Sequence, residues 1–315
     1  MPLSYDPEFL KEAAPVLQQL AQAERAPLHD VATRRSMMAA LTRPLPAMPD
    51  GVENLVHRVP TTNGHEVAVY HFRPMQEPRD GGEPAIVHIH GGGYFSLSAE
   101  QCSVPHVGSV QRTGVQILTI DYRLSPEHPY PTPLNDCWTA LEWVYANAER
   151  LSIDHSRIAL MGESAGGGLA AALTLRARDR ALSPPIAKQI LVYPMLDDRT
   201  TTNHAGELAF WNEVDNITGW TAYLGSDAGS DWIDAYAAPA RVESVEGLPP
   251  LYIDCPQLDI FVHESLEYAK RFVEANIPTE CHVYPGCPHG FEAFAPLSKV
   301  VQQAIANRDK AAMNF

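Results

Sequence analysis

The sequence has few basic residues and no long hydrophobic run. Lys and Arg number 23 against 38 Asp and Glu, so the formal net charge is -15. A field of this sign repels phosphates and anionic lipid headgroups, so we expect no nucleic acid partner. A run of about 18 consecutive apolar residues, as a membrane-spanning helix requires, occurs nowhere, so we expect no membrane span.

Cysteines are also few. The five of them are an odd number scattered through a long chain, which does not match a disulfide framework, and we expect reduced thiols. The segment 1–10 carries acidic residues and no apolar core of the kind that secretory signals have. These features predict a soluble cytoplasmic protein.

The overall composition is that of a folded protein. Of the 315 residues, 45% are hydrophobic and 19% are charged, far from the composition of disordered chains. Length alone suggests two domains, although α/β enzymes of this size often form one.

Apolar residues repeat at helical spacing within the first fifty residues. Two helices are predicted there, the first with Leu10, Ala13, Leu17 and Leu20 on one face and the second with Val31, Met38 and Leu41. The stretch containing Pro44, Pro46 and Pro49 is typical of a linker. We expect residues 1–50 to form a helical unit that precedes the main domain, 51–315.

Eight short runs with the composition of β-strands follow, and each of the first four is bounded by Gly, Pro or Asp. They cover 56–59, 67–72, 85–90, 115–122, 158–161, 190–193, 251–254 and 281–284. Amphipathic helices are predicted between them at about 134–145, 165–178, 265–275 and 298–307. This alternation predicts an α/β fold, with a mostly parallel sheet, helices on both faces, and ligands bound beyond the carboxyl ends of the strands.

The stretch 197–225 fits no strand pattern and is rich in large apolar residues, namely Phe210, Trp211, Trp220, Tyr223 and Leu224. One interpretation is a buried helical insertion. The other joins this stretch to the N-terminal helices as a cap over the active edge of the sheet.

The most specific local pattern is Gly162-Glu163-Ser164-Ala165-Gly166, which lies between a predicted strand and a predicted helix. A serine at such a turn is exposed in a strained conformation, and the flanking glycines avoid crowding. The helix N-terminus adds positive partial charge nearby. A G-x-S-x-G pattern arises by chance in about a tenth of chains this long, so alone it is only suggestive.

A second pattern, His90-Gly91-Gly92-Gly93-Tyr94, follows the strand predicted at 85–90. Successive glycines let backbone N–H groups approach a ligand, and those of Gly92 and Gly93, with that of Ala165, are suited to an oxyanion hole. The alternatives are a flexible turn or a phosphate-binding loop, but neither phosphate signature, G-x-x-x-x-G-K-[ST] nor G-x-G-x-x-G, is present here.

Several side chains are possible metal ligands, namely His88, His90, Cys281, Cys287 and His289. Their spacing matches no known metal signature, and the adjacent Cys281 and His282 would point to opposite faces of a strand. We therefore expect no metal, and we expect His90 to hold its own loop by hydrogen bonding.

Ser164 needs a base, and the base needs a partner that fixes its tautomer. Among the downstream histidines His204, His263, His282 and His289, the last follows the final predicted strand and lies beyond the carboxyl edge of the sheet. For the acid, Asp254 and Asp259 both lie near the end of the strand at 251–254. Asp259 falls in the following loop, and we prefer it, with Asp254 as the alternative.

Four motifs in order resemble the hormone-sensitive-lipase-like (bacterial type IV) carboxylesterases of the α/β hydrolases. They are His90-Gly91-Gly92-Gly93, the segment 121–129 (DYRLSPEHP), Gly162–Gly167 and Pro288-His289-Gly290-Phe291. The resemblance covers residue 56 onward and implies an α/β-hydrolase fold with a helical cap. The family motif Asp-Pro-Leu-x-Asp-Glu reads here Asp259-Ile260-Phe261-Val262-His263-Glu264, and aligning the family's Tyr-Ala with Tyr268-Ala269 puts the acid on Asp259.

The resemblance and the motifs together predict a serine carboxylesterase with the triad Ser164, Asp259 and His289 and no cofactor. The family implies short- to medium-chain acyl esters as small-molecule substrates, and a homodimer through the last strand. Two alternatives stay open. The same triad serves amidases, peptidases and acyltransferases, and some relatives without the catalytic histidine are non-catalytic binding modules. The presence of His289 argues against a non-catalytic binding module.

Overall fold

The computed structural model describes residues 2–22, 24–42, 44–45, 47–76 and 81–315. Pro46 of the predicted linker lies outside the described residues. All five cysteines are unpaired. No helix formed by the described residues is long and apolar enough to cross a membrane.

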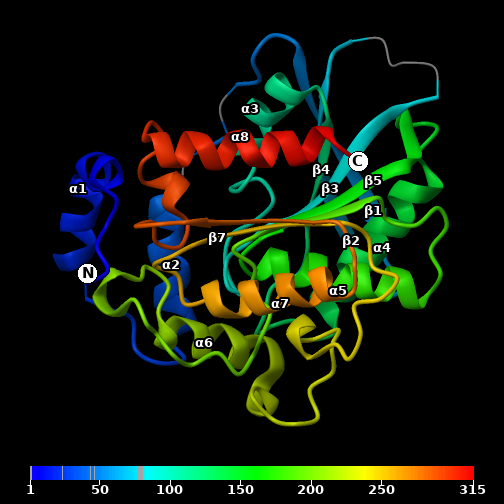
Figure 1. Ribbon diagram of the computed structural model, residues 1–315. Helices are drawn as coiled ribbons and strands as arrows, with labels where there is room; N and C mark the ends of the chain where they lie inside the picture. The colour runs from blue at the N-terminus through cyan, green and yellow to red at the C-terminus, as the bar shows by residue number, and fades with distance from the viewer. Residues whose placement is uncertain (1, 23, 43, 46, 77–80) are drawn as a thin grey trace.

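Eight strands form one sheet in the order β1-β2-β4-β3-β5-β6-β7-β8 (Figure 1). Neighbouring strands from β4 to β8 are parallel, and β2 is antiparallel to both of its neighbours, so the predicted mostly parallel sheet is confirmed. The strands are β1 Val52–Pro60, β2 Glu66–Pro74, β3 Glu83–Ile89, β4 Gln116–Asp121, β5 Ile153–Glu163, β6 Lys188–Val192, β7 Leu251–Pro256 and β8 Thr279–Tyr284.

Helices cover both faces of this sheet, as predicted. The α-helices are α1 Pro7–Gln22, α2 Val31–Leu41, α3 Val104–Thr113, α4 Thr132–Ala146, α5 Ala165–Asp179, α6 Glu213–Leu224, α7 Val262–Glu274 and α8 Lys299–Met313. Helices α3 and α8 lie over one face, and α5 and α7 lie over the other (Figure 1). Strands β6 and β7 are buried along their whole length, which is typical of parallel strands covered on both faces.

Helix α3 was not predicted from the sequence. Its buried residues are His106, Val107 and Val110, a short apolar face that includes a polar residue. Pro105 occupies the first turn, where its missing N–H costs nothing, and the helix ends at Gly114 in the left-handed region with φ 70°.

The N-terminal helices contact the main domain at several points. The amide of Asp6 donates to the carbonyl of Gly286 at 2.9 Å, and Lys299 Nζ lies 2.7 Å from a carboxylate oxygen of Glu8. Helices α1, α2 and α6 gather at one end of the sheet (Figure 1). The division of the chain into a main domain and a cap made of 1–50 and 197–225 stays a prediction.

A buried histidine in β2 makes the fold sensitive to acid. His71 is fully buried, with Nε2 2.7 Å from Gln116 Oε1 and Nδ1 3.3 Å from His57 Nε2. Burial lowers the pKa of His71 from 6.5 to about 4, against the opposing effect of the hydrogen bond with Gln116. Between these two pKa values the unfolded chain binds the proton and the folded protein does not, so stability falls as the pH drops below 6.5.

We therefore expect acidification from pH 7 to pH 5 to reduce the free energy of unfolding more in the wild type than in His71→Gln. The expected difference is about 2 kcal/mol, from the size of the pKa shift. Urea unfolding of both proteins at the two pH values measures it. An identical pH dependence in the two proteins would contradict the role given to His71.

Candidate active site

Ser164 stands alone at the junction of a strand and a helix, since β5 ends at Glu163 and α5 begins at Ala165. Its φ of 56° and ψ of -123° lie in a region that costs a non-glycine residue about 1–3 kcal/mol. The turn is tight, because a Cβ on Gly162 would lie 2.2 Å from the carbonyl oxygen of Gly166. This geometry is that of a nucleophile elbow.

The strained turn is held by backbone hydrogen bonds to the neighbouring strand. The amide of Ser164 donates to the carbonyl of Val192 at 2.9 Å, and its own carbonyl accepts from the amide of Met195 at 2.9 Å. These contacts fix the backbone of Ser164 before any substrate binds.

His289 lies in the loop after β8, and its Nε2 is 3.0 Å from Ser164 Oγ. Aromatic rings surround the imidazole. The ring of Tyr193 meets it edge-on with centroids 4.6 Å apart, and that of Phe261 does so at 5.4 Å. The packing restricts rotation of the imidazole, which keeps Nε2 directed at the hydroxyl.

Asp259 contacts the other nitrogen of the same ring. Its Oδ2 lies 2.5 Å from His289 Nδ1, and its Oδ1 accepts a hydrogen bond from the Phe261 amide at 3.0 Å. The carboxylate is fully buried. A carboxylate at Nδ1 favours the tautomer with the proton on Nδ1, which leaves Nε2 free to accept the proton of Ser164.

Asp254, the alternative acid, has a different set of partners. Both of its oxygens accept from the guanidinium of Arg308, at 2.8 and 2.9 Å, and Tyr252 donates a further hydrogen bond at 2.9 Å. Arg308 also donates to Glu292 Oε1 at 2.8 Å, three residues beyond His289. Asp254 therefore stabilises the loop of His289 from behind and does not contact the imidazole.

The glycines after β3 form a tight turn next to Ser164. Gly92 has φ 114°, and a Cβ there would lie 2.1 Å from the carbonyl oxygen of Ser96. The carbonyl of Gly92 accepts from the amides of Phe95 and Ser96, at 3.1 and 2.9 Å. Within the described part of the chain, the amides of Gly92, Gly93 and Ala165 have no hydrogen-bond acceptor. These N–H groups are thus available to a bound oxyanion.

Glu163, which sequence reasoning left without a role, joins the serine turn to the glycine loop. Its Oε1 accepts from the Gly91 amide at 3.2 Å, and its Oε2 lies 2.5 Å from His88 Nε2. Although burial opposes ionisation, His88 and the Gly91 amide lower the pKa of Glu163 to about 2. In the sequence, only the position of Glu163 inside the G-x-S-x-G pattern indicated that it lies next to the site.

His90, His263 and His282 lie outside the series of contacts that joins Ser164, His289 and Asp259. His90 Nδ1 contacts the carbonyl of Gly91 at 2.8 Å, so the prediction that it holds its own loop is confirmed. His263 is exposed at the start of α7, and His282 lies in β8 beside Glu280. Across the described ranges, no group of three His, Cys, Asp or Glu side chains is placed to hold a metal ion.

Comparison with known proteins identifies the family. Residues 86–293 match the family model described as alpha/beta hydrolase fold. The esterase LipI of Mycobacterium tuberculosis is 31% identical over 248 residues, which cover 77% of this chain and 76% of LipI. The carboxylesterase NlhH of the same species is 34% identical over 219 residues, 67% of each chain.

Solved structures agree with the sequence relatives. A structure named Bacterial Heroin Esterase superposes with a TM-score of 0.87 at 33% identity, covering 98% of this chain and 97% of the other. The esterase LipW from Mycobacterium marinum gives a TM-score of 0.79 at 30% identity, covering 98% and 95%. The predicted resemblance to hormone-sensitive-lipase-like carboxylesterases is thereby confirmed, and the chain belongs to the alpha/beta hydrolase fold family.

Proposed function

We propose that this protein is a serine carboxylesterase that hydrolyses short- to medium-chain acyl esters through an acyl-enzyme, with Ser164, His289 and Asp259 as its triad. The observation that supports it most strongly is the continuous series of contacts from Ser164 Oγ to His289 and on to Asp259, at 3.0 and 2.5 Å. The relatives named esterase and carboxylesterase support the same reaction class.

The reaction proceeds in two halves. Ser164 Oγ attacks the ester carbonyl as its proton passes to His289 Nε2, and Asp259 stabilises the resulting imidazolium. The amides of Gly92, Gly93 and Ala165 bind the oxyanion of the tetrahedral intermediate. When the C–O bond to the alcohol breaks, His289 returns the proton to the leaving oxygen. Water then attacks the acyl-enzyme with His289 as base, and the acid and Ser164 are released.

The surroundings of Ser164 favour uncharged, apolar acyl groups. The indole of Trp211 lies near both the imidazole of His289 and the ring of Phe95, with centroids 6.2 Å apart in each case. The net charge of -15 disfavours anionic esters. A homodimer through β8, which lies at the edge of the sheet, and a cytoplasmic location also stay predictions.

The ester linkage is tested against the amide by comparing p-nitrophenyl butyrate with the p-nitroanilide of the same acid. We expect kcat/KM for the ester to exceed that for the anilide by orders of magnitude, because an amine departs only when it is protonated as the bond breaks. Comparable turnover of both would instead indicate an amidase or peptidase. Adding an alcohol acceptor and measuring ester exchange against hydrolysis separates an acyltransferase.

A fluorophosphonate probe separates the enzyme from a binding module on the same fold. We expect the wild type to be labelled at Ser164 and the Ser164→Ala variant to remain unlabelled, because only an activated serine attacks the phosphorus. An unlabelled, folded wild type would favour the non-catalytic alternative.

A further inference from the structure

The indole of Trp211 forms a wall of the candidate active site. A Cβ added to Gly93 would lie 2.5 Å from Trp211 Cη2, so the indole is already in contact with the glycine loop. The ring also stacks on Phe95 and lies near His289. Trp211 is only 9% exposed. A small displacement of this ring therefore changes the space above Ser164.

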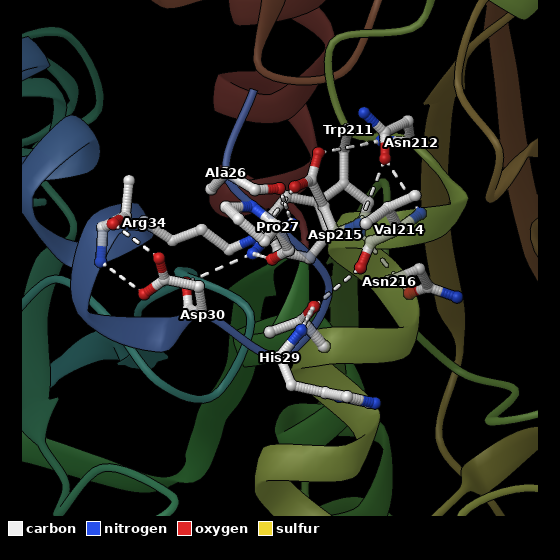
Figure 2. A network of polar contacts seen from close by, with 12 residues as sticks. Ala26, Pro27, His29, Asp30, Arg34, Trp211, Asn212, Val214, Asp215 and Asn216 are labelled. Atoms are coloured by element: carbon white, nitrogen blue, oxygen red, sulfur yellow. Dashed lines mark hydrogen bonds and ion pairs between the residues drawn. The ribbon is translucent and has the colours of Figure 1, made fainter. Parts of the chain in front are cut away.

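The first turn of α6 fixes both the backbone and the ring of Trp211. The indole N–H donates to Asn216 Oδ1 at 3.4 Å, and Asn216 Nδ2 in turn donates to the carbonyl of Thr200 at 2.7 Å. The next residue, Asn212, is the N-cap of α6 and accepts from the amides of Val214 and Asp215 (Figure 2). Trp211 is therefore held by a helix start and follows any movement of it.

Asp215 connects this turn to the N-terminal helices. One of its oxygens, Oδ2, accepts from the Asn212 amide at 3.4 Å, which completes a capping box. The other, Oδ1, accepts from Arg34 Nε at 2.9 Å (Figure 2). The two contacts fix the carboxylate between α6 and α2.

Arg34 itself is rigidly held. It is 5% exposed, and its remaining donors contact the carbonyls of Pro27 at 2.5 Å, Asp30 at 3.2 Å and Ala26 at 3.1 Å. A second contact between the same segments joins the amide of His29 to Thr218 Oγ1 at 3.0 Å. A buried guanidinium with four polar contacts is a fixed donor, so its position sets that of Asp215.

The neighbouring Arg35 contacts the other wall of the site. Its Nε donates to the carbonyl of Phe95 at 2.6 Å, and its Nη1 and Nη2 bind the carboxylate of Glu127 at 2.7 and 2.6 Å. Helix α2 thus contacts α6 through one arginine and the glycine loop through the next. The spacing between Trp211 and Phe95 depends on this helix.

We propose that Arg34 is a positioning residue for acyl-chain selection. By holding Asp215, it fixes the start of α6 and keeps the indole of Trp211 against Gly93, which limits the length of acyl chain that fits above Ser164. This inference rests on the proposed esterase function. Without Arg34, Asp215 loses its cation, three carbonyls lose their donor, and the indole is free to move away from the glycine loop.

The kinetic test uses the ratio of kcat/KM for p-nitrophenyl octanoate to that for the butyrate. We expect Arg34→Met to raise this ratio at least about fivefold, since pocket contacts with single methylenes discriminate substrates by about tenfold or more. Asp215→Asn keeps an oxygen for the capping box, removes the ion pair and should shift the ratio in the same direction. This milder variant decides the question if Arg34→Met does not fold.

Arg25→Met is the matched control. Arg25 lies between α1 and α2, close in sequence to Arg34, but its pairing with Glu207 is at 3.8 Å with side chains 65% and 98% exposed. Its removal should leave the ratio unchanged. In a Trp211→Ala background, Arg34→Met should have no further effect on the ratio, because the residue through which it acts is gone. If Arg34 only stabilised the fold, turnover of both esters would fall together and the ratio would stay constant, which would overturn the proposal.

A second measurement is independent of catalysis. The chain has five tryptophans, so the indole region of a ¹H–¹⁵N spectrum is simple, and Trp211→Phe assigns the Trp211 signal by its loss. We expect Arg34→Met and Asp215→Asn to shift this signal and Arg25→Met to leave it in place. A signal unchanged in all three variants would overturn the proposal. If the folded wild type turned over no ester, the proposed function would fail, and the spectrum would still decide the role of Arg34.

Discussion

Replacing Ser164 by alanine is expected to lower kcat for p-nitrophenyl butyrate by about 10⁴- to 10⁶-fold. The variant keeps the amides of Gly92, Gly93 and Ala165, so only catalysis by the oxyanion hole and by binding remains. His289→Ala should cost a similar factor, and the double variant little more, because the two groups act as a unit. Initial rates measured at saturating ester give these values.

The Ser164→Ala variant should fold as well as the wild type. Alanine at φ 56° carries about the same backbone strain as serine, so the melting temperature should change little. Ser156→Ala is a suitable control, since Ser156 is an exposed serine in β5, the strand that leads to Ser164, and should keep full activity. Turnover retained in a contamination-free Ser164→Ala preparation would reject the mechanism.

The second large effect is expected from Asp259→Asn, which should lower kcat by about 10⁴-fold while leaving the ester KM nearly unchanged. An amide at this position does not favour the proton on His289 Nδ1, and it stabilises the imidazolium less than a carboxylate does. Because the hydrogen bond from the Phe261 amide can persist, the loop should keep its shape. Steady-state kinetics measure the loss of kcat, and circular dichroism of the same preparation shows whether the variant is folded.

Asp254→Asn is the matched variant and should show the reverse pattern. Removing this charge leaves the buried Arg308 without its main partner, which costs about 3–5 kcal/mol of stability for a broken buried ion pair. At a temperature where the variant remains folded, kcat should stay within about tenfold of the wild type, as expected for a residue that acts only by supporting the loop. If Asp254→Asn abolished turnover in the folded state and Asp259→Asn did not, the acid of the triad would be Asp254.

Much of the fold was predictable from local sequence patterns. The elements that were missed or misplaced have explanations in their own sequences. All eight strand positions were predicted, because each strand contains a β-rich run next to turn residues, and the buried parallel strands among them are short apolar runs. The start of β5 was placed too late, since Asp154, His155 and Ser156 are polar. Its first residue, Ile153, nevertheless pairs with Glu83 of β3. Helix α3 was missed because its apolar face is short and is interrupted by Pro105 and Gly108.

The chemistry of the site was predictable because two of its motifs are continuous in sequence. The preference for Asp259 over Asp254 rested on its place in the loop and on the family resemblance, since both residues lie near the end of β7. The two residues differ in their partners, and the Arg308 that pairs with Asp254 comes 54 residues later. The contact between Arg34 and Asp215 joins residues 181 positions apart, so no pattern within either segment indicates it.

The carboxylate of Glu163, which joins the serine turn to the Gly91 amide, has a consequence for recombination between related hydrolases. A chimera that takes the serine turn from one parent and the glycine loop from another inherits the two halves of this contact separately. If the halves do not match, either a backbone amide or an ionised carboxylate is left unsatisfied close to the reacting carbonyl. Crossover points chosen from sequence identity alone therefore risk inactive hybrids, and the two loops are best exchanged together.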